Sequence, residues 1–410
     1  MDNDKRFVTG LDVGTENVRA IIATVNKDGA VAIVGYNEGK SAGMRKGMPA
    51  NLTGPAESID KMLGEAERMG GYEVRSAFVS IGGSQVISTR TEGMIAVGTV
   101  EHEINDQDLD RVEDVAVTGR IPANRDVLDV VPLEYALDGQ GGIKDPLGMS
   151  GARLEIRANV VSALTPNCEN LKKATLAADV KAERLVPGVV AAARAVLTDR
   201  QRENGVAVID MGAATTSVAV YEEDDLQYVG VTPAGSNNIT NDLAIVLAID
   251  PEMAEEIKLR FVTGDFDTEK PPVIRIGKEG KTERAFDRKE VEEVVKARLE
   301  EIFSEIRKKL KNAHYDQRLP EGIVLTGGGA KMRDIDLFAK KCLEAAVRIG
   351  TPQGLGGVSE SIEKPEFATA VGLALLAAEQ SSIKFGPIKK SSKLPKLKSP
   401  NFFKKIFSKF

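Results

Sequence analysis

Two short Asp-x-Gly turns are the residues of this sequence whose types and spacing point most directly to chemistry. Asp12 and Gly14 end one apolar run, and Asp210 and Gly212 end another. A glycine at a strand end lets backbone N–H groups approach a phosphate closely, because no Cβ stands in the way. Hydroxyl donors follow both turns: Thr15, Thr215 and Thr216. The turns therefore predict a site that grips one polyphosphate from two sides.

The carboxylates of the same two turns suit a magnesium ion. Mg²⁺ dehydrates reluctantly, so proteins usually hold it through water and one or two carboxylates. We expect Asp12 and Asp210 to hold Mg²⁺ in this way. A single Asp-x-Gly is usually a plain β-turn, but two of them after matched apolar strands favour a nucleotide site.

A glycine triplet and a charged pair extend the predicted site. The triplet follows an apolar run at 323–325 and comprises Gly327, Gly328 and Gly329, with Ala330 behind it. Bare backbone of this kind suits a flat purine base or a ribose. Glu255 and Lys258 are three residues apart on an expected helix and share a face. They can bracket the nucleoside, although spacing alone favours a solvated ion pair.

Residues 399–410 have a different chemistry. At about 100° per residue along a helix, the apolar side chains gather on one face: Phe402, Phe403, Ile406, Phe407 and Phe410. Lysines occupy or flank the rest of the surface: Lys404, Lys405 and Lys409. An apolar face with basic surroundings is typical of a helix that lies in a membrane interface. We expect this segment to bind an anionic membrane and to fold as it binds, because so short a helix is marginal in water. The alternative is that its apolar face packs on the protein's own body or on a partner helix, although the Pro/Ser/Lys linker argues against self-docking.

Composition narrows the class of protein. A chain of 410 residues suits two lobes rather than one core. Two cysteines and two histidines argue against a disulfide framework, a zinc site and a Ser-His-Asp triad. The segment 384–410 contains nine Lys and no Asp or Glu, so the body is more acidic than the net charge of −6 suggests. An acidic body argues against a protein that binds nucleic acid. No run approaches the ~20 apolar residues of a membrane span, and no signal peptide is apparent, so membrane contact is expected to be peripheral.

Apolar runs alternate with helix-like segments, a pattern typical of an α/β protein. Strands are expected at 7–13, 18–25, 31–36, 77–82, 206–210, 216–221 and 323–325. Helices are expected at 55–69, 106–120, 166–178, 183–197, 287–312 and 367–379. Because the segment around Asp210 repeats the opening of the chain, we expect duplicated lobes around a nucleotide cleft.

The expected domain boundaries follow from changes in this pattern. The first lobe covers 1–84 and is completed, with a hinge helix, by 166–200. Between them, 85–165 is rich in polar strands and reads as a small inserted α+β subdomain. The second lobe covers 201–380, with a smaller nucleotide-capping subdomain near 240–312. A flexible basic linker (381–398) leads to the amphipathic helix at 399–410.

Five motifs, in order, resemble those of the actin and sugar-kinase superfamily. Residues 11–15 with Arg19 resemble its first phosphate motif, 210–216 the second and 325–330 the adenosine motif. Residues 186–192 and 368–373 resemble the two connecting hinge helices. The resemblance implies an actin-like (ribonuclease H-like) fold that binds ATP and Mg²⁺. It adds Gly235, Glu255 and Lys258 to the expected nucleotide contacts.

Within the superfamily the chain is most similar to the FtsA family of bacterial division actins. The similarity rests on residues 8–15, 79–84 and 235–244, on the place of the insertion, and on the basic linker with its amphipathic end. It implies a protein of the cytoplasmic face of the cell membrane, at the division site. Such a protein polymerises with itself, anchors the ring protein FtsZ, and recruits later division proteins through the inserted subdomain.

The resemblance also implies particular contacts. Arg298 and Glu301, on the helix expected at 287–312, match positions that contact the C-terminal peptide of FtsZ. Asn237 and Asn238 depart from the family, which usually has Gly or other small residues there. No residue stands out as the activator of an attacking water, so at most weak ATPase activity is expected.

Other functions of the same superfamily fit less well. A soluble ATP-dependent kinase for small molecules could use Asp242 as its base, but would have no use for the basic tail. A chaperone ATPase carries a large substrate domain after its lobes. A pilus actin usually lacks the terminal helix, and a cell-shape actin lacks this insertion.

Overall fold

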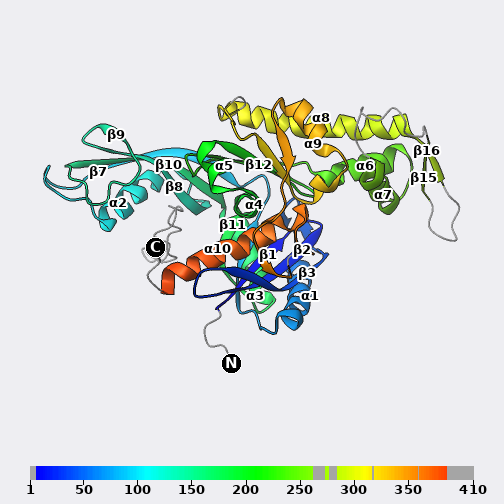
Figure 1. Cartoon of the computed structure of the whole chain (residues 1–410), viewed down its shortest axis with the longest axis horizontal. Helices are drawn as coiled ribbons and strands as arrows, with labels where there is room; N and C mark the ends of the chain where they lie inside the picture. Colours follow the sequence, from blue (N-terminus) through cyan, green and yellow to red (C-terminus); the bar gives the residue numbers. More distant parts are fainter. Residues whose placement is uncertain (1–5, 262–272, 277–283, 316–317, 359, 386–410) are drawn as a thin grey trace.

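The computed structural model describes residues 6–261, 273–276, 284–315, 318–358 and 360–385 (Figure 1). Two α/β lobes lie one above the other in this view, and a smaller, strand-rich body extends from one side of them. The expected amphipathic helix at 399–410 and most of the basic linker lie outside the described residues. None of the described helices combines the length and apolarity that a membrane crossing needs.

The first lobe is built on a six-stranded sheet. In spatial order its strands are β11 (Lys181–Pro187), β6 (Ser76–Ile81), β1 (Arg6–Val13), β2 (Asn17–Val25), β3 (Val31–Lys40) and β19 (Gly356–Gly357). Strands β1, β2 and β3 form an antiparallel meander, β6 runs parallel to β1, and β11 runs parallel to β6. Helix α1 (Thr53–Gly70) packs on β2 and β3, and α3 (Thr165–Ala177) packs on α1 and β11. A short hairpin of β4 (Met44–Arg45) and β5 (Met48–Pro49) contacts α3.

The second lobe repeats this arrangement. In spatial order its strands are β14 (Asp225–Thr232), β13 (Thr216–Glu222), β12 (Val206–Met211), β17 (Ile323–Thr326) and β18 (Val347–Ile349). Strands β12, β13 and β14 again form an antiparallel meander. Strand β17 runs parallel to β12, and β18 runs parallel to β17. The predicted duplication of an actin-like lobe is confirmed.

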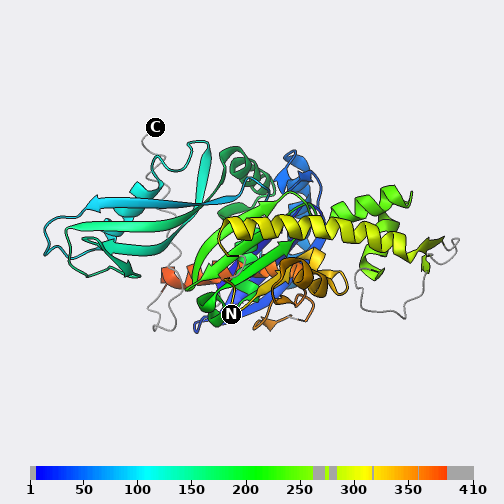
Figure 2. The same cartoon turned by 90° about the horizontal axis from the view of Figure 1, so that it is seen from above.

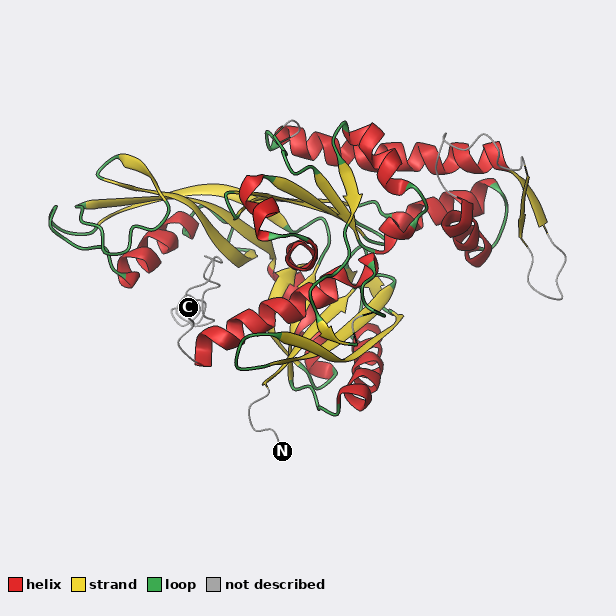
Figure 3. Cartoon of the chain, in the orientation of Figure 1, coloured by secondary structure: helices red, strands yellow, loops and turns green. Residues whose placement is uncertain are grey.

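Helices complete the second lobe (Figure 3). They are α5 (Asp199–Asn204), α6 (Ser236–Val246), α7 (Pro251–Phe261), α8 (Arg288–Asn312) and α9 (Ile335–Leu343), with the short turns η1 (Gly328–Lys331) and η2 (Pro365–Phe367). The hairpin of β15 (Val273–Ile276) and β16 (Arg284–Asp287) leads into α8. The long α8, yellow in Figure 2, runs along the lobe and buries apolar side chains spaced three or four apart. The carboxylate of Asp287 caps its first turn by accepting from the Lys289 N–H at 2.9 Å.

Two helices join the lobes. Helix α4 (Gly188–Val196) packs on β12 and β13, α10 (Ala368–Phe385) packs on β1 and β6, and the two helices contact each other. A Cβ at Gly372 would overlap the carbonyl oxygen of Ala191, and one at Gly10 would overlap that of Ala370. These glycines allow backbones to touch where the two lobes are connected.

The inserted subdomain is a four-stranded sheet with one helix. Its strands, in spatial order, are β7 (Ile87–Ala96), β10 (Arg153–Leu164), β8 (Arg125–Leu137) and β9 (Gln140–Ile143). Helix α2 (Asp106–Val117) packs on β7 and β10 over a small core of its own. The side chain of Asn105 caps α2 by accepting from the N–H groups of Gln107 and Asp108.

The insertion leaves the first lobe but docks on the second. The Ser88 hydroxyl accepts from the Val229 N–H at 2.8 Å, and the Asn159 side chain donates to the Leu226 carbonyl at 2.8 Å. Lys144 pairs with Asp225 at 2.8 Å. These contacts cover β14, the edge strand of the second sheet, and so protect an edge that could otherwise pair with another chain.

One predicted helix is partly wrong. The segment 183–197 was expected to be helical throughout, but it begins inside β11, and α4 starts only at Gly188. The reason is local: a residue before proline is pushed to extended backbone, so Val186 favours a strand, while Pro187 suits a helix start. Leu185 and Val186 then pair with Val79 and Ser80 of β6.

Candidate nucleotide site between the two lobes

The two Asp-x-Gly turns form matched hairpins, one in each lobe. In the β1–β2 hairpin the Gly14 N–H donates to the Asn17 carbonyl at 3.1 Å. In the β12–β13 hairpin the Gly212 N–H donates to the Thr215 carbonyl at 2.9 Å. A Cβ on Gly14 would stand 2.7 Å from the Asn17 oxygen, so a side chain there would open the turn. The sequence similarity between the turns thus corresponds to the same backbone geometry.

Asp12 is held by its own lobe. Its carboxylate accepts from the Ser80 hydroxyl at 2.7 Å, and Arg19 lies 3.7 Å away. Arg19 is itself paired with Glu38 at 2.5 Å and stacks over the Phe367 ring. Burial raises the pKa of Asp12, while Arg19 and the Ser80 hydrogen bond oppose that rise.

Asp210 is the corresponding carboxylate of the second lobe. It accepts from the Thr369 hydroxyl at 3.3 Å. Burial, followed by the negative charge of Asp12, raises the pKa of Asp210 to about 6. Two partly buried carboxylates that repel each other form a place where a divalent cation would be stabilising. Among the described residues no group of three or more His, Cys, Asp or Glu could hold a metal ion, so a magnesium ion here would take its other ligands from water and phosphate.

The glycine triplet packs against the second hairpin. Gly327 has φ 87°, and a Cβ on it would collide with the Asp210 carboxylate. A Cβ on Gly329 would stand 2.5 Å from the Met211 side chain. Gly328 differs from both, because nothing lies within 4 Å of its Cβ position. The outer glycines therefore serve packing, Gly328 leaves open space for a ligand, and Ala330 is buried beneath.

The start of α6 is attached to the second hairpin. The Ser236 N–H donates to the Gly212 carbonyl at 2.9 Å, and the Asn237 N–H to the Ala213 carbonyl at 2.8 Å. A Cβ on Gly235 would stand 2.6 Å from the Gly212 oxygen, so this approach needs glycine. The arrangement brings the N-terminus of a helix, which favours negative charge, next to the predicted phosphate site.

Two of the three hydroxyls predicted as phosphate donors have protein partners. Thr15 accepts from the Gly47 N–H at 2.9 Å. Thr216 is fully buried and donates to the Ala234 carbonyl at 2.8 Å, which ties β13 to the turn before α6. Thr215 lies in the turn itself, and its carbonyl closes the hairpin.

The Glu255–Lys258 pair is not the solvated pair that spacing favoured. Lys258, on α7, is only 2% exposed. Its ammonium donates to Glu255 at 2.5 Å, to the Thr240 hydroxyl at 3.0 Å and to the Ser236 carbonyl at 3.3 Å. Burial lowers the pKa of Lys258, and Glu255 opposes the shift. The pair connects α7 to the start of α6, and Glu255 remains 41% exposed in its side chain.

Arg298 and Glu301 lie on α8. Arg298 holds both oxygens of Asp242 on α6, at 2.6 and 3.1 Å, and Glu301 at 2.6 Å. This bidentate pair engages Asp242, the residue that a small-molecule kinase would need as a free base. The structure therefore weakens the kinase hypothesis and gives Arg298 a structural partner within its own lobe.

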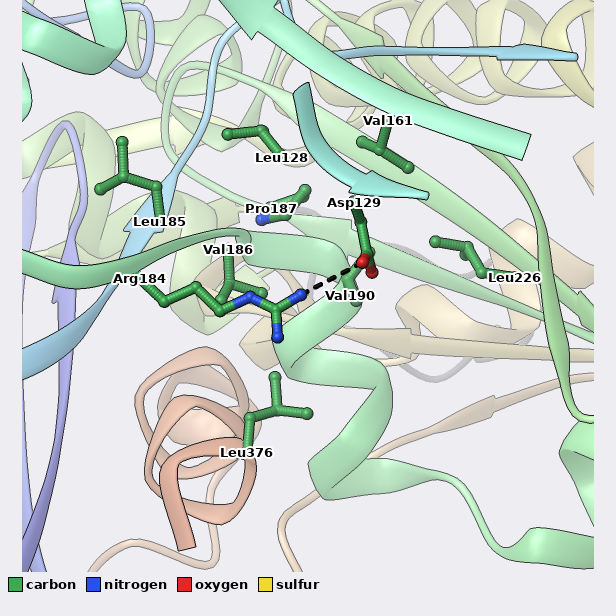
Figure 4. A pocket seen from close by; sticks show the side chains of 10 residues that line it. All are labelled: Leu128, Asp129, Val161, Arg184, Leu185, Val186, Pro187, Val190, Leu226 and Leu376. Carbon is green, nitrogen blue, oxygen red and sulfur yellow. Dashed lines mark hydrogen bonds and ion pairs between the residues drawn. The ribbon is translucent and has the colours of Figure 1, made fainter. Parts of the chain in front are cut away.

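A small cavity lies elsewhere, where the insertion meets both lobes (Figure 4). It measures about 30 Å³, enough for a water molecule or two but far too small for a nucleotide. Apolar side chains such as Leu226 and Leu376 line it, and the Arg184–Asp129 ion pair, 3.2 Å long, borders it. None of the predicted nucleotide contacts is among its lining residues.

Solved structures of other proteins share this fold. A chain of the PilM–PilN type IV pilus biogenesis complex matches 90% of this chain and 98% of its own length, with a TM-score of 0.65 and 18% identity. MreB5 of Spiroplasma citri bound to ADP matches 93% of this chain and 99% of its own length, with a TM-score of 0.53 and 13% identity. The chain thus has an actin-like fold, which it shares with these structures.

Sequence comparisons identify the family. A family model described as "Cell division protein FtsA" matches residues 207–372, and one described as "SHS2 domain inserted in FTSA" matches residues 83–162. Cell division protein FtsA of Pseudomonas aeruginosa is 32% identical over 92% of this chain and 90% of its own length. The Escherichia coli protein of that name is 31% identical over 90% of both chains, and the Bacillus subtilis one 30% identical over 93% of this chain and 86% of its own. The chain belongs to the FtsA family of cell division proteins.

Sequence reasoning missed some residues of the site. Ser80 and Thr369 donate to the carboxylates of Asp12 and Asp210. The sequence marks their segments only by a resemblance to family motifs. Glu16, directly after the first turn, was not singled out, although it bonds across to the second lobe. The sequence signal that could have identified these residues is a polar side chain near the end of a strand or the start of a hinge helix.

Proposed function

We propose that this chain is an ATP-binding division actin that works on the cytoplasmic face of the cell membrane at the division site. The backbone around Gly14 and Gly212 holds the phosphates, Asp12 and Asp210 hold Mg²⁺ through its waters, and the base lies against Gly328. Magnesium supplies positive charge that offsets the phosphates and the two carboxylates. The convergence of two carboxylates from matched hairpins carries this proposal.

The nucleoside contact is divided between two residues of α7. Lys258 is too buried to present its ammonium to a ligand, whereas Glu255 is partly exposed. We infer that Glu255 accepts from the ribose hydroxyls and that Lys258 holds it in place. Thr15, Thr215, Thr216, Gly235, Gly327, Gly329 and Ala330 shape the backbone around the ligand.

Membrane attachment is assigned to residues 399–410, by way of the basic linker 381–398. Near an anionic leaflet each lysine contributes ~1 kcal/mol, and burying the phenylalanines adds to this at ~25 cal/mol per Å². One such helix binds reversibly. Polymerisation of the chain would strengthen attachment by linking many helices in one filament.

Two further surfaces are proposed for partners. Arg298 and Glu301 on α8 receive the C-terminal peptide of FtsZ, with Arg298 exchanging Asp242 for a carboxylate of the peptide. The inserted subdomain receives later division proteins, and an open groove of about 2250 Å³ between it and the second lobe offers charges of both signs, including Arg90, Arg157 and Glu222. For the limits of the lobes and of the inserted subdomain, we propose those that the sequence predicts.

The nucleotide proposal is tested by filling the open space at Gly328. Gly328→Val adds a small side chain at a Cβ position with nothing within 4 Å, so the fold should be retained while the base is excluded. The control is Gly64→Val on α1, where a Cβ also meets nothing within 4 Å. Calorimetry should show at least tenfold weaker Mg-ATP binding for Gly328→Val only. Equal affinity in both variants would overturn the assignment of the site.

A further inference from the structure

Asn237 connects the two phosphate hairpins. Its backbone N–H donates to Ala213 in the second hairpin at 2.8 Å. Its side-chain Nδ2 donates to the carboxylate of Glu16 at 2.8 Å, and Glu16 lies in the first hairpin. A single residue of the second lobe thus contacts both hairpins at once, although they belong to different lobes and are 221 residues apart at this contact.

Glu16 is held in place from its own lobe. Lys40, at the end of β3, pairs with the other carboxylate oxygen at 2.6 Å, and the Ser41 N–H donates to the Glu16 carbonyl at 2.9 Å. Burial acts to raise the pKa of Glu16, but the hydrogen bonds from Lys40 and Asn237 lower it overall. Glu16 is therefore ionised at neutral pH, and a hydrogen bond to a charged acceptor is stronger than one between neutral groups.

The two asparagines at the start of α6 have separate roles. Asn238 accepts from the Gly235 N–H at 2.9 Å and so caps the helix within its own lobe. The side chain of Asn237 is not needed for that cap and reaches the other lobe instead. The departure from small residues at this position thus corresponds to an additional interlobe hydrogen bond.

We propose that Glu16 and Asn237 form a clasp between the lobes that slows the release of bound nucleotide. This inference rests on the proposed nucleotide site. The lobes are joined by the contact of α4 with α10 and by the insertion docked on β14, so a nucleotide held between the hairpins leaves when the hairpins separate about these contacts. Separation breaks the hydrogen bond between Glu16 and Asn237, which adds to the barrier for release. Since the pair is partly exposed, its loss should speed release about three- to tenfold.

The experiment measures the release of a fluorescent ATP analogue with Mg²⁺ from the full chain by stopped flow. Asn237→Ala and Glu16→Ala should each speed release three- to tenfold, and the double variant should be no faster than the faster single variant, because both changes remove one interaction. Asn237→Asp, which places two carboxylates in contact, should release at least as fast as Asn237→Ala.

Two controls isolate the clasp. Asn204→Ala removes a hydrogen bond of the same kind, 2.8 Å to Glu321, within the second lobe, and should leave the release rate unchanged. Lys40→Ala keeps the interlobe bond and should have a smaller effect than Asn237→Ala. Thermal unfolding without nucleotide, and Asn237→Ser as a second variant, guard against misfolding.

The possible outcomes separate the two hypotheses. If the unmodified chain does not bind the analogue, the proposed nucleotide site fails. If it binds, but Asn237→Ala releases at the original rate, the clasp alone fails. If Glu16→Ala slows release, Glu16 acts by repelling the phosphates rather than by closing the lobes, which also overturns the clasp.

Discussion

Asp210→Asn should make the protein without nucleotide more stable while it weakens Mg-ATP binding. The variant keeps the size of the side chain and an oxygen that can accept from Thr369, so its main effect is to remove the charge. Burial and Asp12 raise the pKa of Asp210 from 3.8 to about 6. At about 1.36 kcal/mol per pKa unit, ionising this buried group costs the folded protein on the order of 3 kcal/mol at neutral pH.

The sign follows from linkage. A carboxyl whose pKa is higher in the folded state favours folding below its unfolded pKa, and this contribution is lost as the pH rises through the folded pKa. For Asp210 the pH range over which this contribution is lost therefore runs from about 4 to about 6. Above it, the wild-type protein carries the cost of the charge and the Asn variant does not. Below it, the two proteins should have similar stability.

The assay is thermal unfolding of both proteins without nucleotide at pH 7.5 and pH 4.5, with calorimetry of Mg-ATP at pH 7.5. The variant should melt about 2–5 °C higher at pH 7.5, and the difference should shrink at the lower pH. Its affinity for Mg-ATP should fall at least tenfold. A variant that is less stable at pH 7.5, or a difference that does not depend on pH, would refute the reasoning about two partly buried, mutually repelling carboxylates.

Three other changes test the packing and the proposed peptide site. Lys258→Met removes a buried ammonium and its bond to Glu255, which keeps the Thr240 hydroxyl, so the protein should lose about 1–3 kcal/mol of stability and bind ATP more weakly, measured by urea unfolding and calorimetry. Gly372→Ala should destabilise the junction of α4 and α10 by about 1–3 kcal/mol. An unchanged unfolding midpoint would contradict the close approach of these two helices. Arg298→Ala should weaken binding of an FtsZ C-terminal peptide several-fold by fluorescence anisotropy; an unaltered dissociation constant would remove Arg298 from the interface.

Much of the fold could be predicted because its signals are local. The two Asp-x-Gly turns and the strands around them depend on residues within one hairpin, and the same geometry recurs in both lobes. The helix expected at 287–312 likewise has nearly the observed bounds of α8. The error at 183–197 arose because apolar residues of a buried parallel strand and of a helix look alike, and only Pro187 marked the boundary.

The details of the site could not be predicted because they depend on packing between distant segments. The burial of Lys258 follows from the way α7 packs on α6, which no residue spacing within α7 reveals. The bond between Glu16 and Asn237 joins two lobes. The docking of the insertion on β14 likewise pairs residues far apart in the chain, such as Ser88 and Val229. The local sequence pattern identifies candidate residues of the site, and the tertiary structure determines which residues they contact.

The most direct test of the account is co-sedimentation with vesicles that contain anionic lipid, with and without Mg-ATP. It compares the full chain, a chain that ends at Lys398, and the full chain with Phe407→Glu. We expect only the unmodified full chain to pellet with the lipid, more strongly with Mg-ATP, and to form filaments on the vesicles by electron microscopy. If all three proteins remain in the supernatant, or if all three pellet equally, the proposal of a membrane-bound, ATP-dependent division actin is contradicted.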